Sequence, residues 1–185
     1  MRVQRGRLLR NAAGSLGILL ILVVIAVGLP AVDRSFPAER AVPHHLPYEV
    51  GGGVSVVPPA GAVLDVTRTR PTARQGTALF VLGPVRYVLV VAPFDGDLDG
   101  AVDRLRRKVT SADGQLDAGL PALTGTGLGG RSGAYTTPDR AGRYAVFLAP
   151  TVSIEVTVSG TETQLEEIEP VIAASVATIT YQERM

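Results

Sequence analysis

The chain has 185 residues, a formal net charge of +1 and a hydrophobic fraction of 46%. It contains no cysteine, which excludes disulfides, thiolate catalysis and cysteine-ligated zinc. The first 32 residues hold four arginines and no acid, so subtracting 4 from 18 leaves 14 basic against 17 acidic residues in the remainder. A mildly acidic domain lacks the concentrated basic surface that phosphate contacts need, and we therefore expect no nucleic-acid partner.

The N-terminal segment has the pattern of a membrane anchor. Residues 11–32 carry no charge over 22 positions, and they follow a basic tail, residues 1–11. About 20 apolar residues in a helix cross a hydrocarbon core roughly 30 Å thick, which predicts a transmembrane helix over residues 12–32. Because basic flanks stay in the cytoplasm, we expect a single-pass cell-membrane protein with a cytoplasmic N-terminus and an extracytoplasmic C-terminal domain. The arginines that set this orientation are Arg2, Arg5, Arg7 and Arg10.

A cleaved signal peptide is the alternative for the same segment. Its apolar region would run about 7–15 residues and end in small residues. The apolar centre, residues 16–29, is 14 residues long, and Ala26 and Gly28 would suit a cleavage site. The length of the whole uncharged span favours a signal anchor, and cleavage near Gly28 remains the open alternative.

The remaining chain divides into a tether and one domain. Residues 33–50 contain Pro37, Pro43 and Pro47 without apolar periodicity, which predicts a proline-rich tether. Residues 51–181 are enough for one hydrophobic core and too few for two domains.

Most of the predicted domain has the period of β-strands. Strands are expected at residues 54–56, 62–69, 77–82, 86–92, 132–137, 143–149 and 152–158, with turns at 58–61, 83–84 and 138–142. In the last of these strands the valines and isoleucine alternate with Ser153, Glu155 and Thr157. This alternation predicts a sheet with one buried face and one face partly exposed to water.

Two segments have the helical period. Leu98, Ala101, Val102, Leu105 and Val109 lie on one face of a helix expected at residues 97–111. A second apolar stripe runs near the C-terminus, with Thr163 and Glu166 as the expected capping box and with Pro170 predicting a kink or a late start. Its members are Leu165, Ile168, Ile172, Val176 and Ile179. The predicted fold class is α+β, a mainly antiparallel sheet packed by two amphipathic helices.

Two short motifs carry a resemblance to a known fold. Residues 57–61 (VPPAG) follow the first predicted strand, and residues 172–176 (IAASV) lie in the last predicted helix. With the order of elements, they make the chain similar to proteins of the PsbP-like fold, most of all its actinobacterial exported branch. Members of this fold resemble one another as binding or assembly modules, so the resemblance implies a non-catalytic role.

An acidic run resembles the start of a calcium loop. Asp95, Asp97 and Asp99 match D-x-D-x-D-G, but loop position twelve, where a bidentate glutamate belongs, is Arg106. The same residues are explained by a helix start, with Asp97 as the cap and Asp99 in the first turn, where the helix dipole favours acids. We favour this second interpretation.

The glycine run at residues 125–130 matches G-x-G-x-x-G. A dinucleotide site requires these glycines to open a helix inside a βαβ unit, and the residues that follow are turn- or strand-like. We expect a flexible connection between strands that could border a binding cleft.

The other polar candidates do not form a recognisable catalytic set. His44 and His45 lie in the predicted tether, which leaves the domain without a histidine for a Ser-His-Asp arrangement or a metal site. Glu155 and Asp65 lie in strands and are expected to face outward. A loop cluster could meet anionic headgroups or an acidic partner, but solvated charges explain it as well; it consists of Arg68, Arg70 and Arg74. We assign no catalytic, cofactor-binding or metal-binding residue.

The sequence therefore favours a membrane-anchored, non-catalytic domain that binds a protein partner or an envelope ligand. One alternative is a lipid or glycolipid carrier, which predicts a sizeable apolar cavity between the sheet and a helix. Another is an envelope hydrolase, which predicts a deep pocket that holds two carboxylates.

Overall fold

The structure, a computed structural model, describes residues 39–183. Glu39–Met185 forms one compact unit. The expected basic tail, residues 1–11, and the expected transmembrane helix, residues 12–32, lie outside the described residues. Within residues 39–183, no helix has the length and apolar character needed to cross a bilayer.

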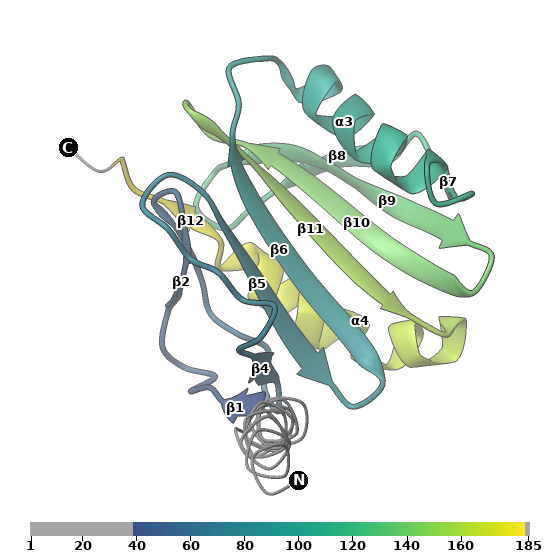
Figure 1. The fold of residues 1–185 in the computed structure, drawn as a ribbon, viewed down its shortest axis with the longest axis horizontal. Helices are drawn as coiled ribbons and strands as arrows, with labels where there is room; N and C mark the ends of the chain where they lie inside the picture. The colour runs from purple at the N-terminus through teal and green to yellow at the C-terminus, as the bar shows by residue number, and fades with distance from the viewer. Residues whose placement is uncertain (1–38, 184–185) are drawn as a thin grey trace, which may run out of the picture. The chain divides into compact units, whose positions relative to one another are not determined.

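A nine-stranded antiparallel sheet forms the centre of the domain (Figure 1). Its strand order is β1-β4-β5-β6-β11-β10-β9-β7, and β8 pairs with β9 beside β7. One half contains β1 (Glu39–Ala41), β4 (Val63–Asp65), β5 (Gly76–Leu82) and β6 (Val85–Pro93). The other half contains β11 (Val152–Gly160), β10 (Arg140–Leu148), β9 (Gly129–Thr137), β7 (Gln115–Leu116) and β8 (Leu120–Leu123).

Glycine-containing turns join the strands that the sequence predicts as neighbours. β5 and β6 form a hairpin in which Gly83 has a φ of +56°, a conformation that glycine adopts without steric cost. Before β4, the backbone N–H of Ala62 donates to the Pro59 carbonyl, which closes the predicted proline turn. The expected hairpin between β9 and β10 is also present.

A small second sheet joins the two ends of the domain. It contains β2 (Tyr48–Gly51), β3 (Val54–Val56) and the C-terminal strand β12 (Thr180–Tyr181), in the order β12-β3-β2. The folded unit thus begins earlier than the predicted tether, residues 33–50, implies, because β1 and the first three residues of β2 lie within that range. Val50 of β2 is fully buried, so this stretch contributes to the core.

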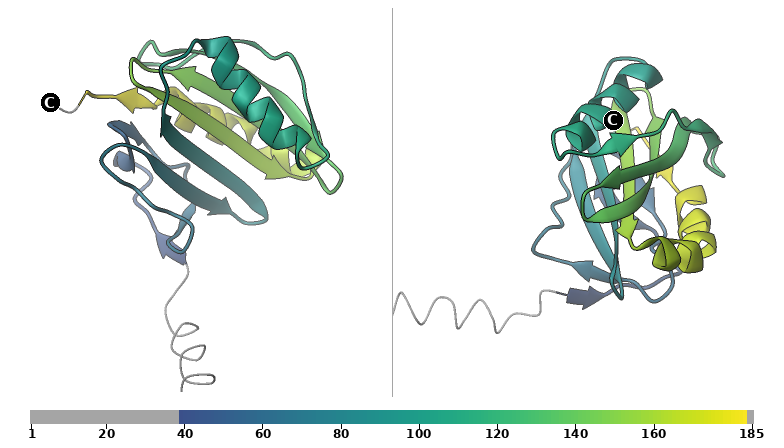
Figure 2. Two further views of the ribbon diagram at one scale, coloured as in Figure 1. Left: turned by 45° about the horizontal axis from the view of Figure 1, so that its top comes forward. Right: turned by 90° about the vertical axis from the view of Figure 1, so that its right-hand side faces the viewer.

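Two helices pack on opposite faces of the large sheet, as Figure 2 shows. α3 (Leu98–Thr110) buries Ala101, Val102, Leu105 and Val109 as its spacing predicts. These side chains pack with Tyr144 and Val146 of β10, whereas Ala145 and Phe147 of the same strand belong to the cluster that contains α4 (Glu162–Ala177). The α+β fold class with a mainly antiparallel sheet and two helices is confirmed.

On the face of the sheet under α3, the expectation that Glu155 faces outward is wrong. Glu155 is 3% exposed, and Ser153 is fully buried. Arg104 of α3 donates from Nε to Glu155 Oε1 at 3.0 Å, and Lys108 donates to Oε2 at 2.5 Å. Both faces of β11 are therefore buried. The buried Glu155 carboxylate is tolerated because cations and hydrogen bonds satisfy it.

The start of α4 also differs from the prediction. The capping box consists of Thr161 and Gln164, two residues before the expected Thr163 and Glu166. The helix runs from Glu162 past Pro170, so of the two expectations, a kink or a late start, the late start is wrong. A proline inside a helix removes one backbone hydrogen bond, and here the packing of the apolar stripe compensates for it.

Candidate functional site: an apolar cleft beneath the C-terminal helix

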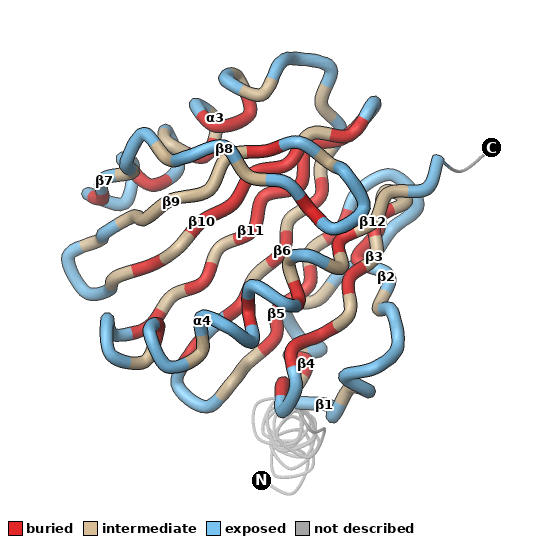
Figure 3. The backbone as a smooth tube through the Cα atoms, turned by 180° about the vertical axis from the view of Figure 1, so that it is seen from behind, coloured by how far each residue is buried: buried red, intermediate tan, exposed pale blue. Residues whose placement is uncertain are grey.

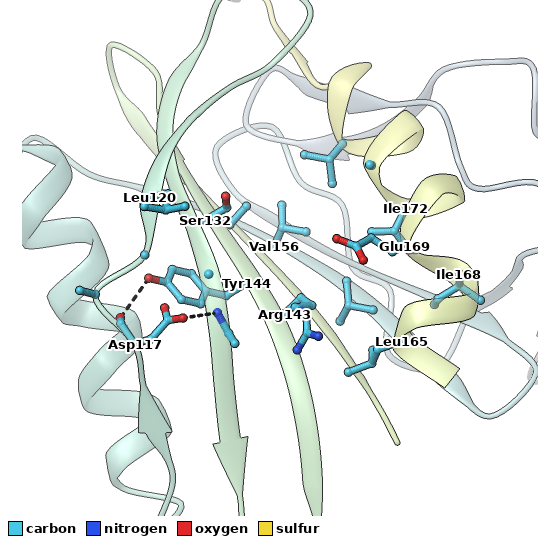
Figure 4. Close-up of a pocket in the computed structure, with 18 residues that line it drawn as sticks. Asp117, Leu120, Ser132, Arg143, Tyr144, Val156, Leu165, Ile168, Glu169 and Ile172 are labelled. Carbon is cyan, nitrogen blue, oxygen red and sulfur yellow. Dashed lines mark hydrogen bonds between the residues drawn. The ribbon is translucent and has the colours of Figure 1, made fainter. Parts of the chain in front are cut away.

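A cleft of about 680 Å³ lies between the large sheet and α4. Figure 4 shows its three sides: the strands as floor, α4 as one wall, and the segment from β7 to β8 as the other. Small-molecule sites in proteins have volumes of about 300–1,000 Å³ and mostly apolar linings, and this cleft has both properties. We take it as the candidate functional site.

The floor is hollow because its side chains are small. Residues paired across an antiparallel ladder share one face of the sheet, so the register defines the floor. Ser132 and Ala134 of β9 pair with Ala145 and Arg143 of β10. Val156 and Val158 of β11 continue the same rows. Three of the four β9 and β10 positions thus carry alanine or serine, which leaves space where larger residues would pack against α4.

The α4 wall is apolar and firmly held. Its cleft-facing side chains are Leu165, Ile168, Ile172, Ala173 and Val176. Near the end of the helix, Ser175 Oγ donates to the Val57 carbonyl at 2.6 Å and lies 3.4 Å from the Tyr87 hydroxyl. The backbone N–H of Val57 donates to Thr178 Oγ1 at 2.9 Å. These bonds fix the C-terminal end of α4 to the residue that follows β3, so the packed fold holds this wall of the cleft in place.

The opposite wall is a short strap between β7 and β8. Asp117 Oδ2 accepts the backbone N–H of Ala134 at 2.9 Å, and the Tyr144 hydroxyl donates to the Asp117 carbonyl at 3.2 Å. Burial, together with the negative charge of Asp117, raises the pKa of Tyr144 above its usual value. A side chain at Gly133 would place its Cβ 2.0 Å from Asp117 Oδ1, so the close approach of the strap requires glycine there.

Charges lie at the rim of the cleft and are mostly acidic. Arg143 forms an ion pair with Glu162 of α4. The hydrogen bond to Glu162, with further support from the charges of Glu169 and Glu166, raises the pKa of Arg143 above its usual value. Asp117 and Glu169 are exposed at opposite walls. The cation on the floor is thus already compensated by acids.

The residues of the calcium-like run perform the helix-start roles. Asp97 is the N-cap of α3 and accepts the backbone N–H of Gly100 at 2.8 Å. Asp99 pairs with Arg131 at 2.9 Å, and Asp103 pairs with Arg106. Among residues 39–183, no group of three or more acidic or histidine side chains is placed to hold a metal ion.

Residues 125–128 of the glycine run lie between β8 and β9, as expected, and Gly129 and Gly130 begin β9, so the run does not open a helix. Gly125 donates its backbone N–H to the Ala177 carbonyl at 2.8 Å, and Thr126 Oγ1 donates to the Ile179 carbonyl at 2.7 Å. The loop is therefore attached to the end of α4. It is not among the segments that line the cleft.

The remaining candidates lie away from the cleft. His44 and His45 are exposed in the loop between β1 and β2, with their ring centres 5.4 Å apart. Asp65, at the end of β4, accepts three hydrogen bonds from Thr67 and Arg68. The loop arginines are all exposed; they are Arg68, Arg70 and Arg74.

Sequence patterns revealed only one wall of the cleft. The apolar stripe of α4 was predicted, but the floor and the strap were not, because they come from cross-strand register and from a loop. Figure 3, which shows α4 in front of the sheet, shows that buried and exposed stretches alternate along this helix. The floor could have been suspected only from the small side chains of Ser132, Ala134 and Ala145. The sequence does not show that these residues lie together on one face of the sheet.

Comparisons with known proteins agree on the fold alone. No protein-family model matches the sequence, and no curated protein matches it. The solution structure of cyanobacterial PsbP (CyanoP) from Synechocystis is similar to this chain, with a TM-score of 0.51 and 12% sequence identity. The match covers 71% of this chain and 88% of the CyanoP chain.

A crystal structure from Bacteroides thetaiotaomicron matches 77% of this chain and half of its own, with 13% identity and a TM-score of 0.42, which is too low to support an argument. The actinobacterial branch suggested by the sequence motifs remains a prediction. The strand order, the two helices and the match to CyanoP show that this chain has a PsbP-like fold.

Proposed function

We propose that this chain is a single-pass membrane protein whose extracytoplasmic PsbP-like domain binds an envelope ligand without catalysis. The observation that carries the proposal is the apolar cleft between the sheet and α4, which is the feature that a lipid or glycolipid carrier requires. The proposed occupant is the alkyl chain of an amphiphile. Residues 12–32 would anchor the protein in the bilayer, with the N-terminus in the cytoplasm.

The charges at the rim favour a ligand with an uncharged head group. An anionic head would lie near Asp117, Glu162 and Glu169, whereas the only floor cation, Arg143, already pairs with Glu162. Like charges placed next to one another disfavour binding, so these acids select against an anionic head group. Hydroxyl groups could instead donate to the exposed carboxylates.

The same carboxylates give little support to a hydrolase. A general acid of the glycosidase kind needs a carboxyl that burial keeps protonated. Asp117 and Glu169 are both exposed, and Asp117 already accepts a backbone hydrogen bond from Ala134. Glu155, the buried carboxylate, is held by two cations on the opposite face of the sheet.

Photocrosslinking of the full-length protein in its membrane tests the proposal. The probe is a monoacylglycerol with a diazirine near the end of its alkyl chain, and a fatty acid with the same diazirine is the comparison. We expect the monoacylglycerol to crosslink to peptides from β9, β10 and α4, and the fatty acid to crosslink several-fold less. Ala173→Leu, which fills the cleft from α4, should lower the crosslinking several-fold.

Ala174→Leu is the matched control, because Ala174 is the next residue of the same helix and lines a different groove. It should leave crosslinking to the cleft unchanged. Equal crosslinking of both variants and the unaltered protein, or labelling spread evenly over the domain, would show that the cleft does not bind the alkyl chain.

A further inference from the structure

The β8 edge of the sheet combines exposed apolar side chains with a lack of charge. Leu120 and Leu123 are 74% and 70% exposed, which makes them the two most exposed large hydrophobic side chains of residues 39–183. They lie in a run of 13 residues, 118–130, that contains no charged side chain. On the neighbouring strand Arg131 lies opposite Pro121, but it is paired with Asp99. An apolar edge strand without charges of its own marks an interaction site.

The two leucines point to opposite faces of the sheet. Leu120 pairs with Ser132, which lies on the cleft floor, whereas Leu123 is three residues further along the strand and pairs with Gly129. Because side chains alternate along a strand, positions three apart occupy opposite faces. A protein docked on one face would cover one leucine and leave the other in water.

Strand addition by a partner is also disfavoured. Pro121 lies in the middle of β8 and has no backbone N–H to donate, and proline on an edge strand weakens pairing with a further strand. A lipid surface imposes neither restriction, because acyl chains and glycerol groups surround an inserted edge from both sides and need no hydrogen-bond register.

We propose that the β8 edge inserts into the bilayer surface and that Leu120 and Leu123 are its membrane-contacting side chains. The inference rests on the proposed membrane attachment, because two leucines bind lipid weakly on their own, and a domain that is tethered to a bilayer has a high effective concentration at its surface. Leu120 also lines the cleft, so the inserted edge brings the mouth of the cleft to the acyl chains.

Site-specific fluorescence on the full-length protein tests this insertion. The chain has no cysteine, so Leu120→Cys and Leu123→Cys each create a single labelling site for an environment-sensitive dye. The protein is reconstituted in phosphatidylcholine vesicles that contain lipids with a nitroxide on the acyl chain. We expect quenching several-fold stronger at both positions than at the control, Leu46→Cys, which replaces another exposed leucine outside the β8 edge.

The quenching should be the same at low and high salt, because residues 118–130 carry no charge and phosphatidylcholine has no net charge to attract the domain. Quenching no stronger than at Leu46→Cys would overturn the proposal. Protection of the dye from a water-soluble quencher without lipid quenching would also overturn it, because a protein or a second copy would then cover the edge. Crosslinking in the cleft is a separate measurement, so the ligand proposal can fail while this one holds, and the reverse.

Discussion

Single side chains of α3 attach this helix to the sheet through one buried carboxylate. Glu155 accepts hydrogen bonds from Arg104 and Lys108, but the two cations have different surroundings. Arg104 also donates to Ser153, and its guanidinium carbon lies 5.0 Å from the centre of the Phe94 ring, whereas the Lys108 side chain is 52% exposed. Within residues 39–183, no buried side-chain nitrogen or oxygen lacks a hydrogen-bond partner, so removal of Arg104 would create a defect the fold otherwise avoids.

We therefore expect Arg104→Met to lower the free energy of unfolding by about 2 kcal/mol, and Lys108→Met by less than about 1 kcal/mol. Chemical denaturation at neutral pH measures both values. Equal losses in the two variants would show that Ser153 and Phe94 add nothing to the role of Arg104.

Asp65 gives the domain a dependence on pH. The Thr67 hydroxyl, with the backbone N–H groups of Thr67 and Arg68, holds the pKa of Asp65 below its usual value. A carboxyl whose pKa is lower in the folded state contributes stability above its unfolded pKa of about 3.9, and this contribution disappears as the pH falls through the folded pKa. Asp65→Ala should therefore cost about 1 kcal/mol at neutral pH and progressively less in acid.

Denaturation of the unaltered protein and the variant across acidic pH values tests this. Asp95→Ala, which replaces an exposed loop carboxylate, is the control for the loss of a surface charge. A difference for Asp65→Ala that stays constant down to the lowest pH would contradict the assigned hydrogen bonds.

Among the elements, long periodic segments were predictable and short ones were not. The stripes of α3 and α4 and the alternation in β5, β6, β10 and β11 each repeat several times, so each reports its own structure. β1, β2, β7 and β12 have two to four residues each, which is too short for a period to show, and β12 pairs with β3 from the other end of the domain. Thr161 and Thr163 both precede a glutamine or glutamate by three residues, so sequence alone could not select between two equivalent capping patterns.

Truncation of the chain would measure how much β1 and β2 contribute to the stability of the domain. A fragment of residues 39–185 keeps β1 and β2, whereas a fragment that starts at the predicted boundary, residue 51, loses the pairing of β1 with β4 and the fully buried Val50. We expect the shorter fragment to be less stable by at least about 2 kcal/mol. Denaturation of the two fragments under the same conditions measures the difference, and equal stabilities would restore residue 51 as the start of the domain.

At the scale of the whole molecule, the site depends on a combination that no single segment encodes. The cleft joins a helix, three strands and a strap, and the small residues on its floor become meaningful only when β9 and β10 are aligned. The sequence predicted one buried and one partly exposed face and, for a lipid carrier, a cavity next to a helix. Only the packed sheet shows that α3 covers one face around Glu155 while α4 leaves part of the other open.

The position of β11 has a consequence for how the chain folds during synthesis. β11 lies between β6 and β10, so the two halves of the sheet are joined by a strand that follows β6 by about 60 residues, and β12 then pairs with β3 near the start of the domain. Until β11 emerges, β6 is an open edge that other chains can pair with. The domain is therefore completed only by its last residues, and its vulnerable period is the time needed to deliver them.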